Sequence, residues 1–175
     1  MRVIPSSSRM TDRLSTPAQT AGMWTEPSFR FFADLSVLVD APVEVGEVTH
    51  GRRRLIPITG GTVRGDGWAG RVLPGGADFQ LIVNDQLAEL DARYVLETDG
   101  GDRIYVHNSA LRSGSPELMA RLARGEPVDP AQIYFRCCPR FETAAPALAW
   151  INQRMFFGAG QRHPDKVVMR FHELL

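Results

Sequence analysis

Polar side chains that could move a proton or hold an anion recur at every second position in several short segments of the chain. We single out three candidate catalytic residues, Asp78, Glu142 and Tyr105, and four candidate ligand-binding residues, Arg93, Arg136, Asn108 and Asn152. A carboxylate can act as a general base, a phenol can donate a proton, and an arginine fork can clamp a carboxylate or an enolate. Glu97 is a further candidate base. The set predicts proton-transfer chemistry on a small organic molecule.

Such residues can act together only if the fold brings them to one place. Alternation on β-strands puts each group on one face of its strand; Tyr105, for example, alternates with Ile104 and Val106. In a closed barrel one face of every strand points into a common lumen. We therefore predict that Arg93, Asp78 and Glu142 reach one pocket. The alternative is that this polar face meets water, as in any half-buried antiparallel sheet.

Short β-branched and aromatic runs alternate with glycine-rich turns from about residue 26 onward. Pairs such as Gly60-Gly61, Gly75-Gly76 and Gly100-Gly101 are typical of hairpins. We expect ten strands, at about 28–39, 43–50, 52–58, 62–73, 77–84, 90–98, 103–108, 132–142, 150–158 and 165–173.

One helix is expected at 116–124, where Ser115 can cap the start and Gly125 can end it. Leu118, Met119 and Leu122 form its apolar stripe. A shorter helical turn is expected over 144–149. Many strands with one good helix predict an all-β protein, an up-and-down antiparallel β-barrel of the calycin or lipocalin type with one short helix.

The chain divides into a disordered N-terminal tail over residues 1–25 and a single barrel domain over residues 26–175. The tail is rich in Ser, Thr, Pro and Arg, a composition too polar to repay ordering. Met1, Met10 and Met23 are each candidate start residues.

Composition limits the classes of partner. Among the 175 residues, 20 are basic and 20 acidic, and this zero balance argues against nucleic acid or an anionic membrane as a partner. No export signal or membrane-spanning run is found, and the two cysteines, Cys137 and Cys138, are adjacent. A cytoplasmic protein is therefore expected.

The usual cofactor and metal motifs are missing from the sequence. The Gly158-Ala159-Gly160 run lacks the spacing of a dinucleotide fingerprint, and the four histidines show no close ligand spacing. We therefore predict no cofactor and no metal. All the basic residues except Lys166 are arginines, and the run Arg52-Arg53-Arg54 alternates sides on a strand. Such alternation can point at least one arginine inward, but the stronger expectation is a solvated edge that discourages strand pairing.

Five segments occur together in an order and spacing that resemble a known family. They are Pro57-Ile58-Thr59-Gly60-Gly61, Pro74-Gly75-Gly76-Ala77-Asp78-Phe79-Gln80, Leu90-Asp91-Ala92-Arg93-Tyr94, Phe141-Glu142-Thr143 and Trp150-Ile151-Asn152. The chain from about residue 28 to 174 resembles the bacterial and fungal domain of unknown function 3237, also called uncharacterised protein family 0311. The resemblance implies an up-and-down barrel and no assigned activity. Its motifs fall on Asp78, Arg93, Tyr94, Asn108, Glu142 and Asn152.

Three functions follow from these observations as alternatives. The first is an enzyme that binds a small carboxylate, phenol or ketone in the lumen and catalyses isomerisation, cyclisation or lyase chemistry. The second is a non-catalytic, lipocalin-like cup for a small molecule. The third is a structural module whose barrel is filled by side chains and whose outer apolar face forms a homodimer. A polar cavity favours the first and a filled lumen the third.

Overall fold

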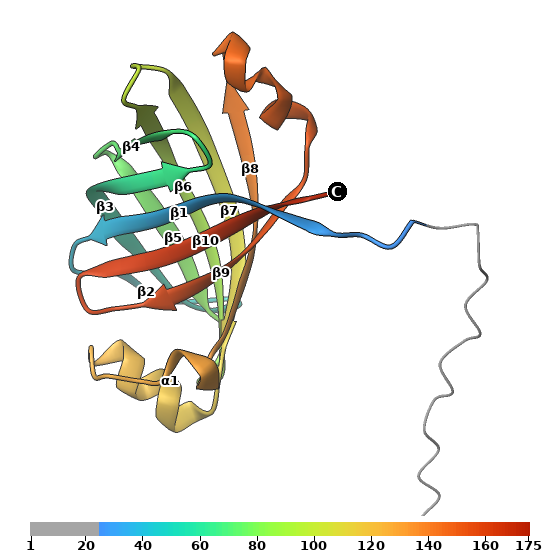
Figure 1. Ribbon diagram of the computed structural model, residues 1–175. Coiled ribbons are helices and arrows are strands. Elements are labelled where there is room, and N and C mark those ends of the chain that lie inside the picture. Colours follow the sequence, from blue (N-terminus) through green and yellow to red (C-terminus); the bar gives the residue numbers. More distant parts are fainter. Residues whose placement is uncertain (1–24) are drawn as a thin grey trace, which may run out of the picture.

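The computed structural model describes residues 25–175, and the predicted tail, except Thr25, lies outside the described residues. This part of the chain forms one antiparallel sheet (Figure 1). Its ten strands are β1 (Phe29–Val39), β2 (Val43–Val48), β3 (Gly51–Gly65), β4 (Ala69–Val72), β5 (Gly76–Ile82), β6 (Leu87–Thr98), β7 (Arg103–Ser113), β8 (Tyr134–Thr143), β9 (Phe156–Arg162) and β10 (Lys166–Leu174).

The sheet closes into a barrel because β1 pairs with β10 on one side and with β3 on the other. Two positions around the barrel are each shared by two short strands. β1 and β2 pair with successive parts of one edge of β3, and β4 and β5 do the same on its other edge. The ten strands thus fill eight positions, each next to its neighbour in sequence. The prediction of an up-and-down antiparallel barrel is confirmed.

Sequence analysis misplaced some element boundaries. The strands expected at 52–58 and 62–73 are joined differently: a single long β3 runs through Gly60 and Gly61, and β4 is only a short return strand. The strand expected at 150–158 is wrong over its first half, which belongs to the 3-10 helix η2 (Pro146–Gln153). The strand expected at 103–108 continues to Ser113. That extension matters, because it carries Arg112 into the barrel.

The predicted helix is present as α1 (Pro116–Ala123), preceded by β7 and followed by the short 3-10 helix η1 (Pro130–Gln132). The Ser115 side chain accepts a hydrogen bond from the Leu118 backbone N–H at 3.4 Å, which caps the first turn as expected. α1 lies across one end of the barrel (Figure 1). None of the helices in residues 25–175 is long and apolar enough to cross a lipid bilayer.

The short helix η2 lies at the opposite end of the barrel from α1 (Figure 1). Aromatic side chains pack together at that end. The Phe32 ring lies 4.7 Å from Phe156 and 4.9 Å from Phe141, measured between centroids, and Trp150 packs edge-on at 5.8 Å. These tilted and edge-to-face contacts stabilise the end beyond the burial of apolar area alone. This half of the lumen is therefore solid.

The register of the sheet decides which residues face the lumen. On β7 the buried residues Ile104, Val106, Asn108, Ala110 and Arg112 alternate with outward-facing ones. The same alternation on β8 buries Cys137 and exposes Cys138, so the two adjacent cysteines lie on opposite faces of the strand. A change of register by one residue would reverse both faces.

We predict that Gly61→Ala strongly destabilises the barrel. Gly61 has φ +140° at the point where β3 pairs with both β1 and β4, and a Cβ there would clash with the carbonyl oxygen of Ser36. Backbone strain plus displacement of a barrel strand should lower the free energy of unfolding by about 2–4 kcal/mol. Urea denaturation measures this. The control is Gly100→Ala, because Gly100 has no positive φ and a Cβ there would only make an ordinary contact with Thr98 Oγ1 at 3.7 Å. Equal stabilities of the two variants would contradict the prediction.

Candidate functional site

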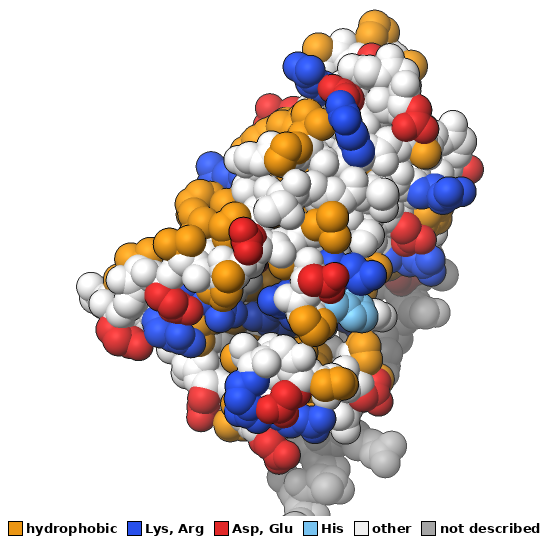
Figure 2. All heavy atoms as spheres, turned by 90° about the vertical axis from the view of Figure 1, so that its left-hand side faces the viewer, with side chains coloured by type: hydrophobic (Ala, Val, Ile, Leu, Met, Phe, Trp, Pro, Cys, Tyr) orange, Lys and Arg blue, Asp and Glu red, His pale blue; other side chains and the backbone are white. Residues whose placement is uncertain are grey.

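A cavity of about 470 Å³ occupies the half of the barrel next to α1. It is bounded by inward-facing residues of the strands and by Met119 and Leu122 of the helix. In Figure 2 a recess between the barrel and the helix-bearing end shows basic side chains in its depth. The volume falls in the range that holds a drug-sized ligand. A barrel filled completely by side chains would leave no such space.

The polar wall of the cavity carries more positive than negative charge. Its acidic lining residues are Asp78 and Asp85, and its basic lining residues are Arg52, Arg54, Arg112, Arg124 and Arg162. Arg52 and Arg54 both reach the cavity while Arg53 between them is exposed, which confirms that the arginine run alternates sides. A site with this charge excess attracts anions.

Asp78 lies at the centre of a short hydrogen-bonded chain. Its Oδ2 accepts from Gln80 Nε2 at 2.5 Å, and Gln80 Oε1 in turn accepts from Arg54 Nε at 2.9 Å. Its Oδ1 accepts from the backbone N–H of Asp91 at 3.1 Å. Burial raises the pKa of Asp78, against the opposing effect of the hydrogen bond from Gln80 and the charge of Arg112. A buried carboxyl with a raised pKa is a typical general acid or base.

Arg112 has unused hydrogen-bonding capacity. It is only 5% exposed, and its Nε has no hydrogen-bond partner among the described residues. Its guanidinium carbon lies 5.9 Å from the centroid of the Phe135 ring. Burial lowers the pKa of Arg112 to about 10, and the nearby charge of Arg54 acts in the same direction. A buried cation with free donors is the part of this wall best suited to hold an anion.

The two neighbouring arginines are already engaged. Arg54 donates from Nε to Gln80, and Arg162 donates from Nη1 to backbone carbonyls, including that of Pro164 at 3.2 Å. Burial lowers the pKa of both arginines, and the charge of Arg54 adds to the effect at Arg162. They thus raise the positive potential at the cavity while leaving Arg112 as the free donor.

The rest of the cavity wall is largely apolar and carries further polar groups. Val37, Ile56, Ile58, Val167 and Met169 are among its apolar lining. Tyr94 and Asn108 line it as well, and Asn108 Oδ1 is buried without a hydrogen-bond partner. Burial raises the pKa of Tyr94, so its phenol stays protonated. The tyrosine in the cavity is therefore Tyr94 and not the predicted Tyr105.

The prediction that Arg93, Asp78 and Glu142 share one pocket is wrong for two of the three. Of the seven predicted site residues, Asp78 and Asn108 line the cavity. Arg93 points outward with its side chain 51% exposed and forms an ion pair with Asp91 at 3.3 Å. Glu142 is exposed on the outer face of β8. These residues lie outside the cavity because of the sheet register. On β6, β7 and β8 the alternate positions that carry Arg93, Tyr105 and Glu142 face the outside of the barrel.

The three remaining predicted residues also lie away from the cavity. Tyr105 points outward from β7, and Arg136 stacks on the outward-facing Tyr134 ring at 5.3 Å. Asn152 holds η2 against β8, because its Oδ1 accepts from the Thr143 N–H at 2.8 Å and its Nδ2 donates to the Thr143 carbonyl at 2.9 Å. The position of Asn152 thus has a structural explanation.

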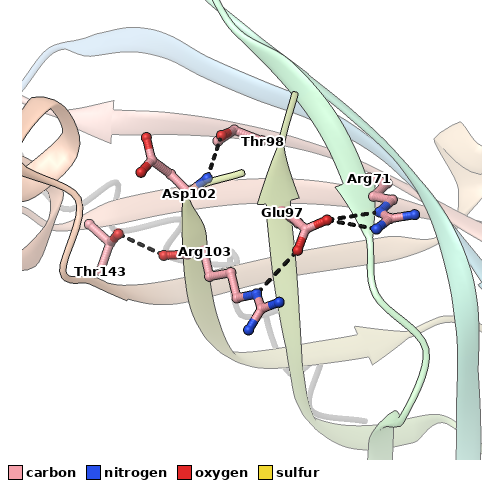
Figure 3. A network of polar contacts seen from close by, with 6 residues as sticks. All are labelled: Arg71, Glu97, Thr98, Asp102, Arg103 and Thr143. Atoms are coloured by element: carbon pink, nitrogen blue, oxygen red, sulfur yellow. Dashed lines mark hydrogen bonds and ion pairs between the residues drawn. The ribbon is translucent and has the colours of Figure 1, made fainter. Parts of the chain in front are cut away.

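Glu97, the further candidate base, is part of an ion-pair network on the outside of the barrel (Figure 3). It accepts from Arg71 Nη2 at 2.7 Å and from Arg103 Nε at 3.1 Å, and these residues come from β4, β6 and β7. The hydrogen bonds from Arg71, followed by that from Arg103, hold the pKa of Glu97 below its usual range. Glu97 is therefore an ionised link between three strands.

Three cavity arginines escaped the sequence analysis as site residues. Arg112 shares the parity of Ile104, Val106 and Ala110, which are the inward apolar residues of its strand. This alternation would have predicted an inward-facing Arg112 if the expected strand had been extended past residue 108. Arg54 was expected only as one member of an alternating run, and Arg162 lies at the end of a strand whose limits were misplaced.

The fold and the site together define a class: an antiparallel barrel with one filled end and one basic, partly apolar cavity. Residues 27–174 match the family described as a protein of unknown function, DUF3237, and the chain belongs to this family. A UPF0311 protein of Rhodopseudomonas palustris is 52% identical over 130 residues, 74% of this chain and 85% of the relative. A UPF0311 protein of Clostridium acetobutylicum is 37% identical over 150 residues, 85% and 95% of the two chains. The predicted family is confirmed.

Solved structures share the barrel. The crystal structure of the conserved protein of unknown function from R. palustris has a TM-score of 0.82 at 43% identity, covering 87% of this chain and 100% of that one. A beta-barrel like protein from Acinetobacter baumannii has a TM-score of 0.77 at 38% identity, covering 87% and 99%. A Penicillium herquei protein described as an enzyme, at 17% identity and TM-score 0.65 over 88% and 98%, shares the fold.

We predict that Arg112→Met stabilises the protein. The change removes a buried charge that lies near two other arginines and lacks a partner for its Nε. Replacing buried charge by an apolar side chain of similar length should raise the free energy of unfolding by about 1–3 kcal/mol. Urea denaturation at neutral pH tests this, with the exposed Arg93→Met as control, expected within about 0.5 kcal/mol of wild type. A destabilised Arg112→Met would show that Arg112 supports the fold.

We predict that Asp78 makes the protein less stable as pH rises. Its pKa is raised in the folded state, so its favourable contribution is complete below its unfolded pKa and is lost as pH rises through the folded value. Asp78→Asn should therefore gain stability relative to wild type from pH 4.5 to pH 8. The measured quantity is the slope, against pH, of the difference in unfolding free energy between Asp78→Asn and wild type. The absolute difference is not used, because rearranged hydrogen bonds to Gln80 add a contribution that does not depend on pH. An unchanged difference between the two proteins across this range would contradict the prediction.

Proposed function

We propose that the cavity binds a small organic anion and that Asp78 transfers a proton to or from it. The ligand class is a carboxylate, a phenol or an enolisable ketone. The observation that carries the proposal is the combination of a buried arginine with free donors and a half-buried carboxyl in the same cavity. This pairing supports cofactor-independent isomerase, cyclase or lyase chemistry.

The geometry gives each group a role. Arg112 would hold the carboxylate or the developing enolate, and the charges of Arg54 and Arg162 would strengthen the field around it. Asp78, fixed by Gln80 and by the Asp91 backbone N–H, would exchange the proton. The apolar wall and α1 would exclude water from the bound ligand. The same barrel fold serves in the Penicillium herquei protein described as an enzyme.

A non-catalytic binding protein is the second candidate, and the apolar residues of the cavity lining favour it. Such a protein would use Arg112 to orient a ligand without moving a proton. The two candidates make the same prediction for binding and differ only in turnover.

We predict that a thermal-shift screen of small carboxylates, phenols and ketones finds ligands whose binding depends on Arg112. Arg112→Gln should weaken binding by about 10- to 150-fold, which corresponds to the 1.5–3 kcal/mol of a charged hydrogen bond. Arg93→Gln, on the outer face, should bind as wild type does. Each shift is measured against the same variant without ligand. Equal binding by both variants would disprove the anion clamp.

Proton transfer is tested on the ligands found in this way. Incubation in D₂O with detection by NMR should show deuterium entering the carbon next to the carbonyl in wild type. Asp78→Asn should slow that exchange by at least about 100-fold while it still binds the ligand. Binding without exchange in wild type would favour the non-catalytic candidate.

A further inference from the structure

The cavity places its free cation and its half-buried carboxyl in one electrostatic unit. Asp78 faces Gln80 on its own strand, Arg54 on β3, Arg112 on β7 and Arg162 on β9. From β6 it faces the Asp91 N–H and the Tyr94 phenol, whose pKa is raised by burial and, to a smaller extent, by the charge of Asp78. Glu44 on β2 and Asp165 before β10 act on Arg54 and Arg162, and Arg124 lines the cavity from the end of α1. Asp78 is therefore the carboxyl surrounded by cations, and its ionised form depends on them.

An anion that enters this cavity changes the surroundings of Asp78 in two ways. It brings a like charge close to the carboxylate, and it takes up the free donors of Arg112, whose charge otherwise favours ionised Asp78. Both effects favour the protonated carboxyl. In a buried site neither effect is screened by water as it would be on the surface.

We infer that the cavity takes a monoanion with an apolar body, and that Asp78 takes up a proton from solvent as this ligand binds. The inference rests on the proposed function and adds the class of ligand and the state of the acid. The proton passes from water or buffer to a carboxylate oxygen of Asp78, and no other bond changes. Asp78 would thus start the reaction as a general acid.

The apolar body follows from the lining. Val37, Ile56, Ile58 and Met169 line the cavity together with the arginines, and Met119 of α1 lines it from the helix. A small inorganic anion would leave these surfaces in contact with water, whereas an aryl or alkyl body would cover them. The charge and the body must therefore belong to one molecule.

Two fluorescent probes that differ only in charge test the ligand class. 8-Anilinonaphthalene-1-sulfonate carries an anion at every pH used, and N-phenyl-1-naphthylamine has the same rings without the sulfonate. The sulfonate should bind wild type at least about 10-fold more tightly than its neutral twin. Arg112→Gln should remove that preference, and Arg93→Gln should keep it.

Proton uptake is measured by calorimetry of the sulfonate in buffers of different ionisation enthalpy, from pH 5 to pH 9. We expect uptake with a maximum inside this range, at most one proton per bound molecule, together with an affinity that falls by up to about 10-fold per pH unit. Asp78→Asn should bind the sulfonate with no uptake.

The outcomes separate this inference from the proposed function. Arg112-dependent binding without proton uptake at any pH would overturn the inference and leave the anion site standing. Uptake that persists in Asp78→Asn would also overturn it, since another group would then take the proton. Failure of the sulfonate to bind, or binding that ignores Arg112, would overturn both.

Discussion

The closure of the sheet between β1 and β3 is the constraint on which the rest of the structure depends. β3 is long enough to pair with two strands on each edge, and Gly61 allows β1 to approach it where the ring joins. Once the ring is closed, the period of two residues per strand decides which side chains enter the lumen. In the observed register Arg112 of β7 and Asp78 of β5 both line the cavity.

The lumen then divides into two halves with different chemistry. Phe32, Phe141 and Phe156 fill the interior near η2 with ring-to-ring contacts. At the other end the inner positions of β9 are glycines, Gly158 and Gly160, up to Arg162, and α1 covers the opening without burying any residue completely. The solid half supplies the stability that lets the other half remain hollow and charged.

Residue patterns predicted the barrel better than they predicted its inside. Hairpin glycines and alternation gave the strands, and Ser115 gave the start of α1, because these signals are local. Alternation shows that a strand has two faces but not which of them faces the lumen. On β5 the face that carries Asp78 points inward, whereas on β6 the face that carries Arg93 points outward. Only closure resolves this. The alternation that Arg112 shares with Ile104 and Val106 predicts that it points inward. Its burial nevertheless contradicts the usual expectation for a charged residue.

The proposed anion site would explain why Arg112 is buried at the expense of stability. Arg93 and Arg71, on the outer face, pair with carboxylates in solvent and need no further explanation. Arg112 is buried, repelled by Arg54 and unpartnered at Nε, an arrangement that folding alone would not favour. An anion in the cavity would supply both the missing charge and the missing hydrogen-bond acceptor. The same anion would reduce the extent to which the charge of Arg112 stabilises ionised Asp78. Ligand binding and the protonation of Asp78 would therefore be coupled through Arg112.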